Sequence, residues 1–275
     1  MRKLLRADFA RLWRDKIFWL ALAAMAAAGQ FCFWARFQSF REGYAAPLED
    51  PFMVYVPVAA IVLSALCALF IGVDYSDGTI RNKLIAGHGR ASVYLSNLVV
   101  CLAAAAVLCA AFMLTYLAPG IPTYGFFGCG LKPMLVCALL GAGALAAFAA
   151  LYTLAAMLCQ NRAYSAVACV LLSLALLMGG VAVKSRLEEP EYYDGYTVIM
   201  NGVTQTEEPE KNPNYISGKT RETFEFLLDF LPGGQAVQLA MREAAYPVRM
   251  ALCDAFILLA ATGAGVIVFK KKNLK

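Results

Sequence analysis

Long apolar runs separated by polar segments dominate the sequence. A helix needs about 20 residues to cross a bilayer, and six runs have roughly that length or more. They are residues 17–35, 52–73, 93–118, 133–159, 163–183 and 250–269. Because a helix satisfies its own backbone hydrogen bonds, it can cross lipid where an open loop cannot. We therefore predict an all-α polytopic membrane protein with six transmembrane helices in a single domain over residues 1–275.

The first 16 residues carry a different pattern. Their apolar side chains recur at helical spacing, and basic side chains occupy the opposite face. Such a helix lies in the headgroup layer rather than crossing it. The next apolar run continues past the small residues 26–28, which resemble a signal-peptide cleavage site, so we expect the segment to be retained. The apolar stripe consists of Leu5, Phe9, Leu12 and Trp13.

A polar island at residues 74–90, reading DYSDGTIRNKLIAGHGR, separates the second run from the third. It predicts a short helix that begins near Gly78, where the side chain of Asp77 or Thr79 can cap the free N–H groups. Gly87 supplies the left-handed residue that commonly ends a helix. The island is therefore strongly patterned for a loop between two spans.

The side chains of this short helix point in different directions. Ile80 and Leu84 are four residues apart and share one apolar edge, whereas Arg81 and Lys83 point elsewhere. Arg90 follows the end of the helix. An apolar edge with basic flanks suits a groove on a soluble partner. We predict that the helix lies across the membrane surface and is held by another protein.

Residues 184–249 form a large polar segment between the last two runs. The first half reads as loop, with a hairpin around Asn201-Gly202. The second half predicts an amphipathic helix over 221–231, ended by the Pro-Gly-Gly at 232–234, and another over 235–246. Two such helices at the outer membrane surface would suit a lid over a central pathway; a solvated connection without further role is the alternative. The candidate lid residues are Phe224, Leu227, Leu228, Leu231, Pro232 and Gly233.

Composition and charge agree with a membrane protein. The chain is 61% hydrophobic, 16% charged and has a mean hydropathy of +0.62, which excludes a soluble domain. A net charge of +5 could suggest nucleic acid, but the basic residues cluster beside the apolar runs, as the positive-inside rule requires. The expected partner is therefore the lipid bilayer and not nucleic acid. This distribution of basic residues predicts that both termini and the polar island at residues 74–90 are cytoplasmic.

Catalytic signatures are missing from the sequence. The nine cysteines fall singly without a C-x-x-C pair, so we interpret them as packing residues. The single histidine, His88, cannot build a cluster, and there is no phosphate-binding G-x-x-x-x-G-K-[ST] loop. We expect no catalytic, metal-binding or cofactor-binding residue. Asp254 lies near the outer end of the last run, where we expect water to reach it, so an interfacial residue is favoured over an ion site.

The order of these features resembles permease subunits of ABC-2 type ABC transporters. In that family the element after the second span often reads as an acid, G-T-I/L, a basic residue and a G-x-x-R ending; here Asp74 stands where Glu is usual. N-R-A-Y-S at 161–165, L-E-E-P-E at 187–191 and L-P-G-G-Q at 231–235 are also similar to members. The residues that match the main motif are Asp77, Gly78, Thr79, Ile80, Arg81, Gly87 and Arg90.

The resemblance implies a permease that pairs with a second permease copy or homologue and sits on separately encoded cytoplasmic ATPase subunits. ATP and Mg would then bind the partner, and this chain would form the pathway in a bacterial cell membrane. Family members usually export, with substrates that include antimicrobial peptides, other hydrophobic compounds, ions and lipid-linked glycans. The residues implied in ATPase coupling are Asp74, Asp77, Gly78, Thr79, Ile80, Arg81, Lys83, Leu84, Gly87 and Arg90.

Two other classes of function stay open on the sequence. A stand-alone secondary transporter or channel would need a midplane ion site or broken spans in related halves, and neither is visible. A membrane scaffold or sensor would use residues 184–249 to bind a ligand. Co-purification of an ATPase subunit would separate all three hypotheses.

Overall fold

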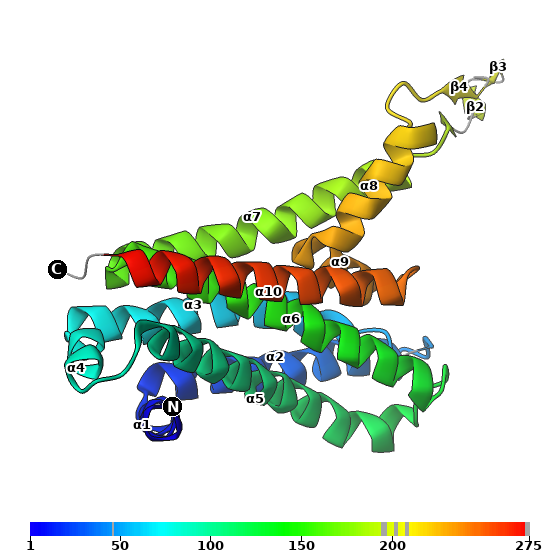
Figure 1. Cartoon of the computed structure of the whole chain (residues 1–275). Helices are drawn as coiled ribbons and strands as arrows, with labels where there is room; N and C mark the ends of the chain where they lie inside the picture. The colour runs from blue at the N-terminus through cyan, green and yellow to red at the C-terminus, as the bar shows by residue number, and fades with distance from the viewer. Residues whose placement is uncertain (46, 194–196, 201–202, 207–208, 273–275) are drawn as a thin grey trace.

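A computed structural model describes every residue of the chain except 46, 194–196, 201–202, 207–208 and 273–275 (Figure 1). In the described part, six helices are long and apolar enough to cross a membrane. Each predicted span lies within one of them, which confirms the all-α polytopic fold. They are α2 (Lys16–Arg41), α3 (Tyr55–Ser76, continuing the short 3₁₀ helix Phe52–Val54), α5 (Arg90–Tyr124), α6 (Leu131–Cys159), α7 (Arg162–Glu188) and α10 (Pro247–Lys271).

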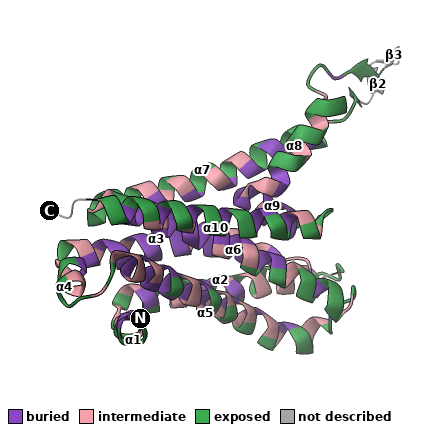
Figure 2. Cartoon of the chain, in the orientation of Figure 1, coloured by how far each residue is buried: buried purple, intermediate pink, exposed green. Residues whose placement is uncertain are grey.

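Helix α3 lies at the centre of the bundle and packs against α2, α5, α6 and α7. In its most apolar stretch 61% of the residues are buried, against 22% in α2. The outer faces of α7 and α10 stay exposed along most of their length (Figure 2). Since these exposed faces are rich in Leu, Val and Phe, they are surfaces for lipid or for another protein rather than for water.

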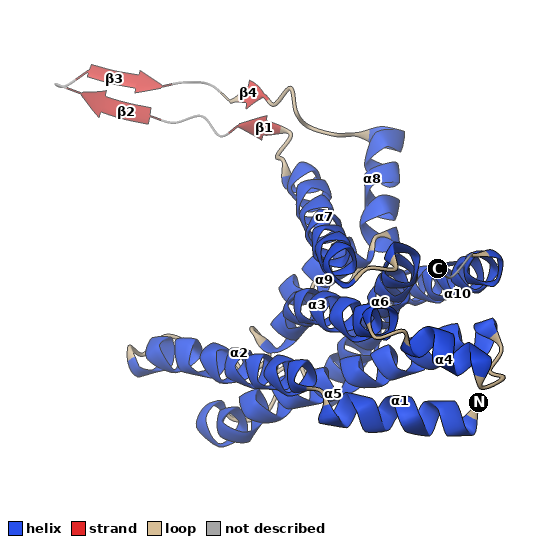
Figure 3. Cartoon of the chain, turned by 90° about the vertical axis from the view of Figure 1, so that its left-hand side faces the viewer, coloured by secondary structure: helices blue, strands red, loops and turns tan. Residues whose placement is uncertain are grey.

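Helix α1 (Arg2–Arg14) lies across the end of the bundle. It is seen end-on in Figure 1 and side-on in Figure 3. Leu4 and Leu12 are buried, and Asp8 lies between them on the same face. Of the predicted apolar stripe, Leu12 faces the bundle and Trp13 is half exposed. A helix with an inward face and outward basic residues fits the headgroup layer.

Helix α4 (Thr79–Ile85) connects α3 to α5 and lies at the same end of the bundle as α1 (Figure 1). It confirms the predicted short helix. The predicted cap by Asp77 or Thr79 is wrong: Gly78 occupies the N-cap with φ +66° and no side chain caps the helix. Gly87 has φ +86°, which confirms the left-handed stop. We call this end of the bundle the α4 end.

The opposite end, which we call the α8 end, carries α8 (Gly218–Phe230) and α9 (Pro232–Met241). The described residues there also form four short strands, which project away from the bundle (Figures 1 and 3). The strands form two antiparallel pairs. The predicted turn at residues 201–202 lies outside the described residues, although Met200 and Val203 on either side of it pair. The strands are β1 (Tyr192–Tyr193), β2 (Thr197–Met200), β3 (Val203–Thr206) and β4 (Glu210–Lys211).

Helix α9 is buried among α7, α6 and α3, so the predicted surface position is wrong for this helix. Its Pro232 occupies the first turn, where a missing N–H costs nothing. A side chain at Gly233 would collide with the backbone of Leu176, and one at Gly180 would collide with Gly233 itself. The L-P-G-G-Q sequence therefore starts the helix and lets α9 approach α7 closely.

Candidate functional site

Four charged side chains meet inside the α4 end. The Lys83 Nζ lies 2.8 Å from an oxygen of Asp8 and 2.8 Å from an oxygen of Asp74. Arg11 forms an ion pair with the same Asp74. Because these residues come from α1, α3 and α4, one network joins the three helices. We call Asp8, Arg11, Asp74 and Lys83 the charge cluster.

The two acids of the charge cluster are buried, and the charges of the cluster balance. The Asp74 side chain is 0% exposed, and that of Asp8 is nearly so. Ser96 on α5 donates its hydroxyl to the second oxygen of Asp8 at 2.6 Å. The Arg11 guanidinium lies 3.8 Å from the centroid of the Phe70 ring. Two acids and two bases compensate one another, which is the condition under which buried charges are tolerated.

Burial acts directly on the two bases. It lowers the pKa of Lys83 from its ordinary value, and the hydrogen bond and charge of Asp8 oppose that shift. Burial likewise lowers the pKa of Arg11, opposed chiefly by the charge of Asp8. The nearby acids therefore stabilise the charged form of each base. Removing one member of the charge cluster should therefore weaken the ion pairs that the remaining members form.

The apolar residues of α4 face in two directions. Ile80 is only 2% exposed and belongs to the core, and Leu84 packs against that core. The expectation that Ile80 provides an edge for a partner is therefore wrong. The outward side carries Arg81, Asn82 and Ile85, of which Ile85 is 78% exposed. We call these three residues the α4 tip.

Arg90 joins two helices at the same end. From the first turn of α5, its guanidinium donates to the carbonyl oxygens of Phe269 at 3.2 Å and of Lys270 at 3.1 Å, and also to that of Lys272. These are unpaired carbonyls at the C-terminus of α10, where a cation is favoured. The predicted coupling residue therefore caps the last helix of its own chain.

The remaining predicted residues fall into two places. Asp77, Gly78 and Gly87 flank α4, and Thr79 is its first residue; all four are partly or fully exposed. The candidate lid residues lie at the α8 end and do not form one exposed surface. Leu228 and Phe224 pack against Val183 and Leu187 of α7, Leu231 is half-buried, Pro232 and Gly233 are buried in α9, and Leu227 stays exposed.

The sequence reasoning missed three members of the α4 end: Asp8, Arg11 and Ser96. Arg11 is one of the basic residues of the first helix, but it reaches inward to Asp74. A signal for Asp8 was present, because it stands four residues after Leu4 and four before Leu12, in the middle of a buried stripe. An acid at such a position requires a buried basic partner.

Asp254 also departs from expectation. It is 4% exposed, so the prediction that water reaches it is wrong. Neither of its carboxylate oxygens has a hydrogen-bond partner among the described residues. It lies on α10 and faces α6. This acid is chemically unlike the paired acids of the charge cluster.

The spanning helices and the crosswise α1 define this chain as an all-α multi-pass membrane protein. The family model described as "ABC-2 family transporter protein" matches residues 4–180, which is more than half of the chain. The chain therefore belongs to the ABC-2 transporter family, as a membrane-spanning permease component of the kind that works with an ABC ATPase subunit. No curated protein matches the sequence.

Proposed function

We propose that this permease is an exporter subunit that couples to a separate cytoplasmic ATPase through α4. The observation that carries the proposal is the division of α4 into two sides. Its inner side is bound to α1 and α3 by the charge cluster, and its outer side presents the α4 tip. A helix fixed at its back and exposed at its front suits the transfer of force from a soluble partner.

The α4 end is the cytoplasmic end in this proposal. Exposed basic side chains gather there, on α1 and α4 and at the end of α10. Positive charges beside spans stay on the cytoplasmic side. The α8 end, with its acid-rich segment, then lies outside. This orientation brings both α1 and the last turn of α10 to the cytoplasmic face.

Movement of α4 would reach the spans through identified contacts. Lys83 joins α4 to Asp74 near the end of α3, the helix at the centre of the bundle. Through Asp8 and Ser96 the same network reaches α5. Arg90 then joins α5 to α10. Closure of the ATPase would therefore shift several spans as one body rather than bend a single loop.

A second permease copy completes the pathway in our proposal. The outward face of α7 carries Val167, Leu171 and Met178, all exposed in the single chain. A pathway for hydrophobic cargo between two such bundles would use the exposed faces of the spans. ATP and Mg bind the ATPase, so this chain supplies no catalytic group.

Co-purification tests the coupling proposal. The tagged chain, expressed with the separately encoded ATPase, should retain it through purification and give ATPase activity in the eluate. Ile85→Asp places a charge in the proposed contact, and burying an unpaired charge costs several kcal/mol. We expect this variant to insert normally and to lose the ATPase.

Tyr192→Asp is the matched control, since Tyr192 is an exposed aromatic residue on β1 at the other end of the molecule. It should retain the ATPase like the wild type. Retention of the ATPase by a normally inserted Ile85→Asp variant would contradict a role for the α4 tip. Loss in both variants would show that the assay reports something other than this contact.

A further inference from the structure

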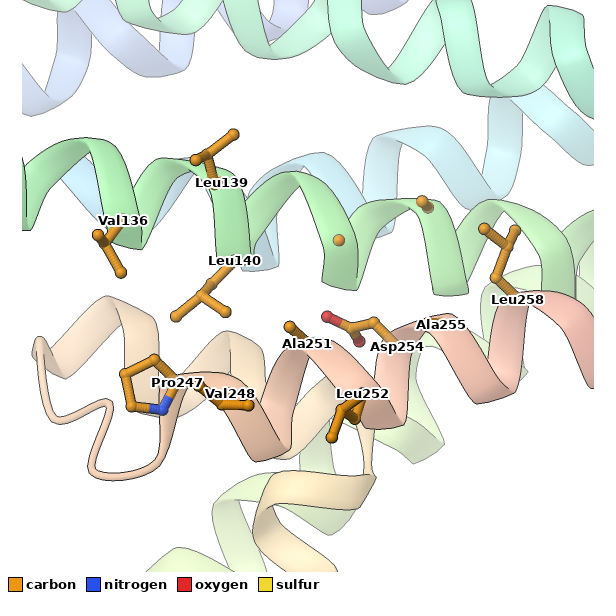
Figure 4. A pocket seen from close by; sticks show the side chains of 12 residues that line it. Val136, Leu139, Leu140, Pro247, Val248, Ala251, Leu252, Asp254, Ala255 and Leu258 are labelled. Atoms are coloured by element: carbon orange, nitrogen blue, oxygen red, sulfur yellow. The ribbon is translucent and has the colours of Figure 1, made fainter.

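A lateral cavity between α6 and α10 contains one charged group. Its volume is about 540 Å³, within the range of ligand sites in proteins. Of the twelve residues that line it, Asp254 is the one with a polar side chain (Figure 4). The rim is open to the surroundings of the bundle, because Leu139 and Val248 are exposed. The cavity is therefore an apolar groove with a single acid.

The carboxylate of Asp254 points from α10 toward α6 (Figure 4). Gly143 on α6 makes the room, since a Cβ at that position would lie 2.7 Å from Oδ2 of Asp254. The carboxylate is buried and neither oxygen accepts a hydrogen bond from any described residue. A buried carboxylate without a donor is costly and requires a partner from outside the chain or a proton.

A second acceptor lies beside it. Gln235 of α9 is the polar neighbour of Asp254 and is fully buried. Both hydrogens of its amide are engaged, because Nε2 donates to the carbonyl oxygens of Asp229 at 2.8 Å and Met250 at 3.2 Å. Its Oε1 has no partner. The Nε2 group also faces Asp254, but its hydrogens are engaged with these two carbonyls, so no described residue brings a positive charge that would compensate the carboxylate.

These acceptors restrict the occupant. Hard metal ions such as Mg²⁺ and Ca²⁺ take about six oxygen ligands, and the groove walls are apolar. An ammonium group has several N–H donors and carries the compensating charge. The groove lining extends along α10 from Pro247 to Leu258, about 16 Å at 1.5 Å per residue. An elongated apolar body can therefore lie between the helices while its amine reaches the acid.

We propose that the groove between α6 and α10 binds hydrophobic compounds that carry a protonated amine, with the ammonium on Asp254. The proposal rests on the proposed function as an export permease, for which it names a substrate class. Occupants enter sideways from the bilayer, because the rim is open there. Gly143 is a positioning residue, because its missing side chain lets the carboxylate stand between α10 and α6.

Binding of radiolabelled dodecylamine tests the site without an ATPase. The full chain is placed in phosphatidylcholine nanodiscs at pH 7, where an amine with an ordinary pKa of about 10.4 is protonated, and empty nanodiscs correct for partition into lipid. We expect saturable binding to the wild type. Dodecanol, with the same chain and no charge, should compete at least about tenfold more weakly, since hydrogen bonds to charged groups are the strong ones.

Asp254→Asn should weaken dodecylamine binding by at least about tenfold. Gly143→Ala keeps the acid, but its Cβ would collide with Oδ2 of Asp254 and displace the carboxylate, so it should weaken binding as well. Glu222→Gln is the control, since it removes one exposed acidic charge from α8, away from the groove, and should bind like the wild type. The two groove variants act through different atoms, so the test does not depend on the folding of one of them.

A proton on Asp254, donated to Gln235, is the competing account of the same geometry. It predicts that dodecylamine and dodecanol bind alike and that Asp254→Asn changes nothing; either result would overturn our proposal. So would the lack of saturable binding to folded wild-type protein. Because this assay contains neither ATPase nor ATP, its failure would leave the coupling proposal untouched, and failure of co-purification would leave this site untouched.

Discussion

Two buried acids of this permease, Asp74 and Asp254, stand in opposite situations. Asp74 lies in the charge cluster, where Lys83 and Arg11 neutralise it. Asp254 faces an apolar groove, and no described residue brings a positive charge to it. Both side chains are nearly inaccessible to water. The difference indicates that the first acid stabilises the fold, whereas the second can bind a group from outside the chain.

Breaking the charge cluster should have the largest effect on stability. Lys83→Met leaves Asp8 and Asp74 with one base, Arg11, between them. Removing one partner from a buried pair costs about 3–5 kcal/mol. We expect a clear fall in the melting temperature of the purified chain. The double variant Lys83→Met with Asp8→Asn restores the charge balance and should be the more stable of the two. Equal stability of Lys83→Met and wild type would show that the cluster contributes nothing.

The next largest effect on stability should be the difference between substitutions on the inner and the outer side of α4. Ile80→Ala removes buried apolar atoms and should cost about 2–4 kcal/mol. Ile85→Ala changes an exposed residue and should stay within about 0.5 kcal/mol of the wild type. Thermal unfolding of both variants measures the contrast. Similar losses in the two would mean that the inner and outer sides of α4 are wrongly assigned.

Neutralising Asp254 should change the stability of the chain in the opposite direction to breaking the charge cluster. Asp254→Asn removes a buried charge that has no partner, so it should be neutral or should stabilise the unliganded chain by about 1 kcal/mol. Asp74→Asn should destabilise it, because Lys83 and Arg11 would lose their acid. The two melting temperatures, measured side by side, decide the comparison. A marked loss of stability in Asp254→Asn would indicate an intramolecular partner.

Removing the Arg90 cap should have the smallest effect. Arg90→Ala exposes carbonyls at the end of α10 and should cost about 1 kcal/mol or less. The change should be local. Hydrogen exchange should increase in the last turn of α10 and stay unchanged in α3. Unchanged exchange near Phe269 would argue against the cap.

The spans were predictable because each is long and apolar. A run such as residues 133–159 has few alternatives to a membrane helix. The short helix between the second and third spans was also predictable, since Gly87 marks its end. The sequence did not predict which side of this short helix faces the core. Spacing places Ile80 and Leu84 on one face but cannot say whether that face meets a partner or the protein itself.

The charge cluster depends on contacts between residues far apart in the chain. Asp8 and Lys83 are 75 positions apart, and no local pattern pairs them. The burial of α9 likewise follows from a close approach between Gly180 and Gly233. The isolation of Asp254 required knowledge of every neighbouring helix, since an acid near the end of a span is usually hydrated. These features come from tertiary packing and not from periodicity.

Photo-cross-linking from the α4 tip tests the central claim most directly. A photoreactive amino acid replaces Ile85 in one variant and Tyr192 in another, and each is illuminated in membranes that contain the co-expressed ATPase. The account predicts a cross-linked product of permease and ATPase from position 85 and none from position 192. A product from position 192 with none from position 85 would contradict both the orientation and the coupling role of α4.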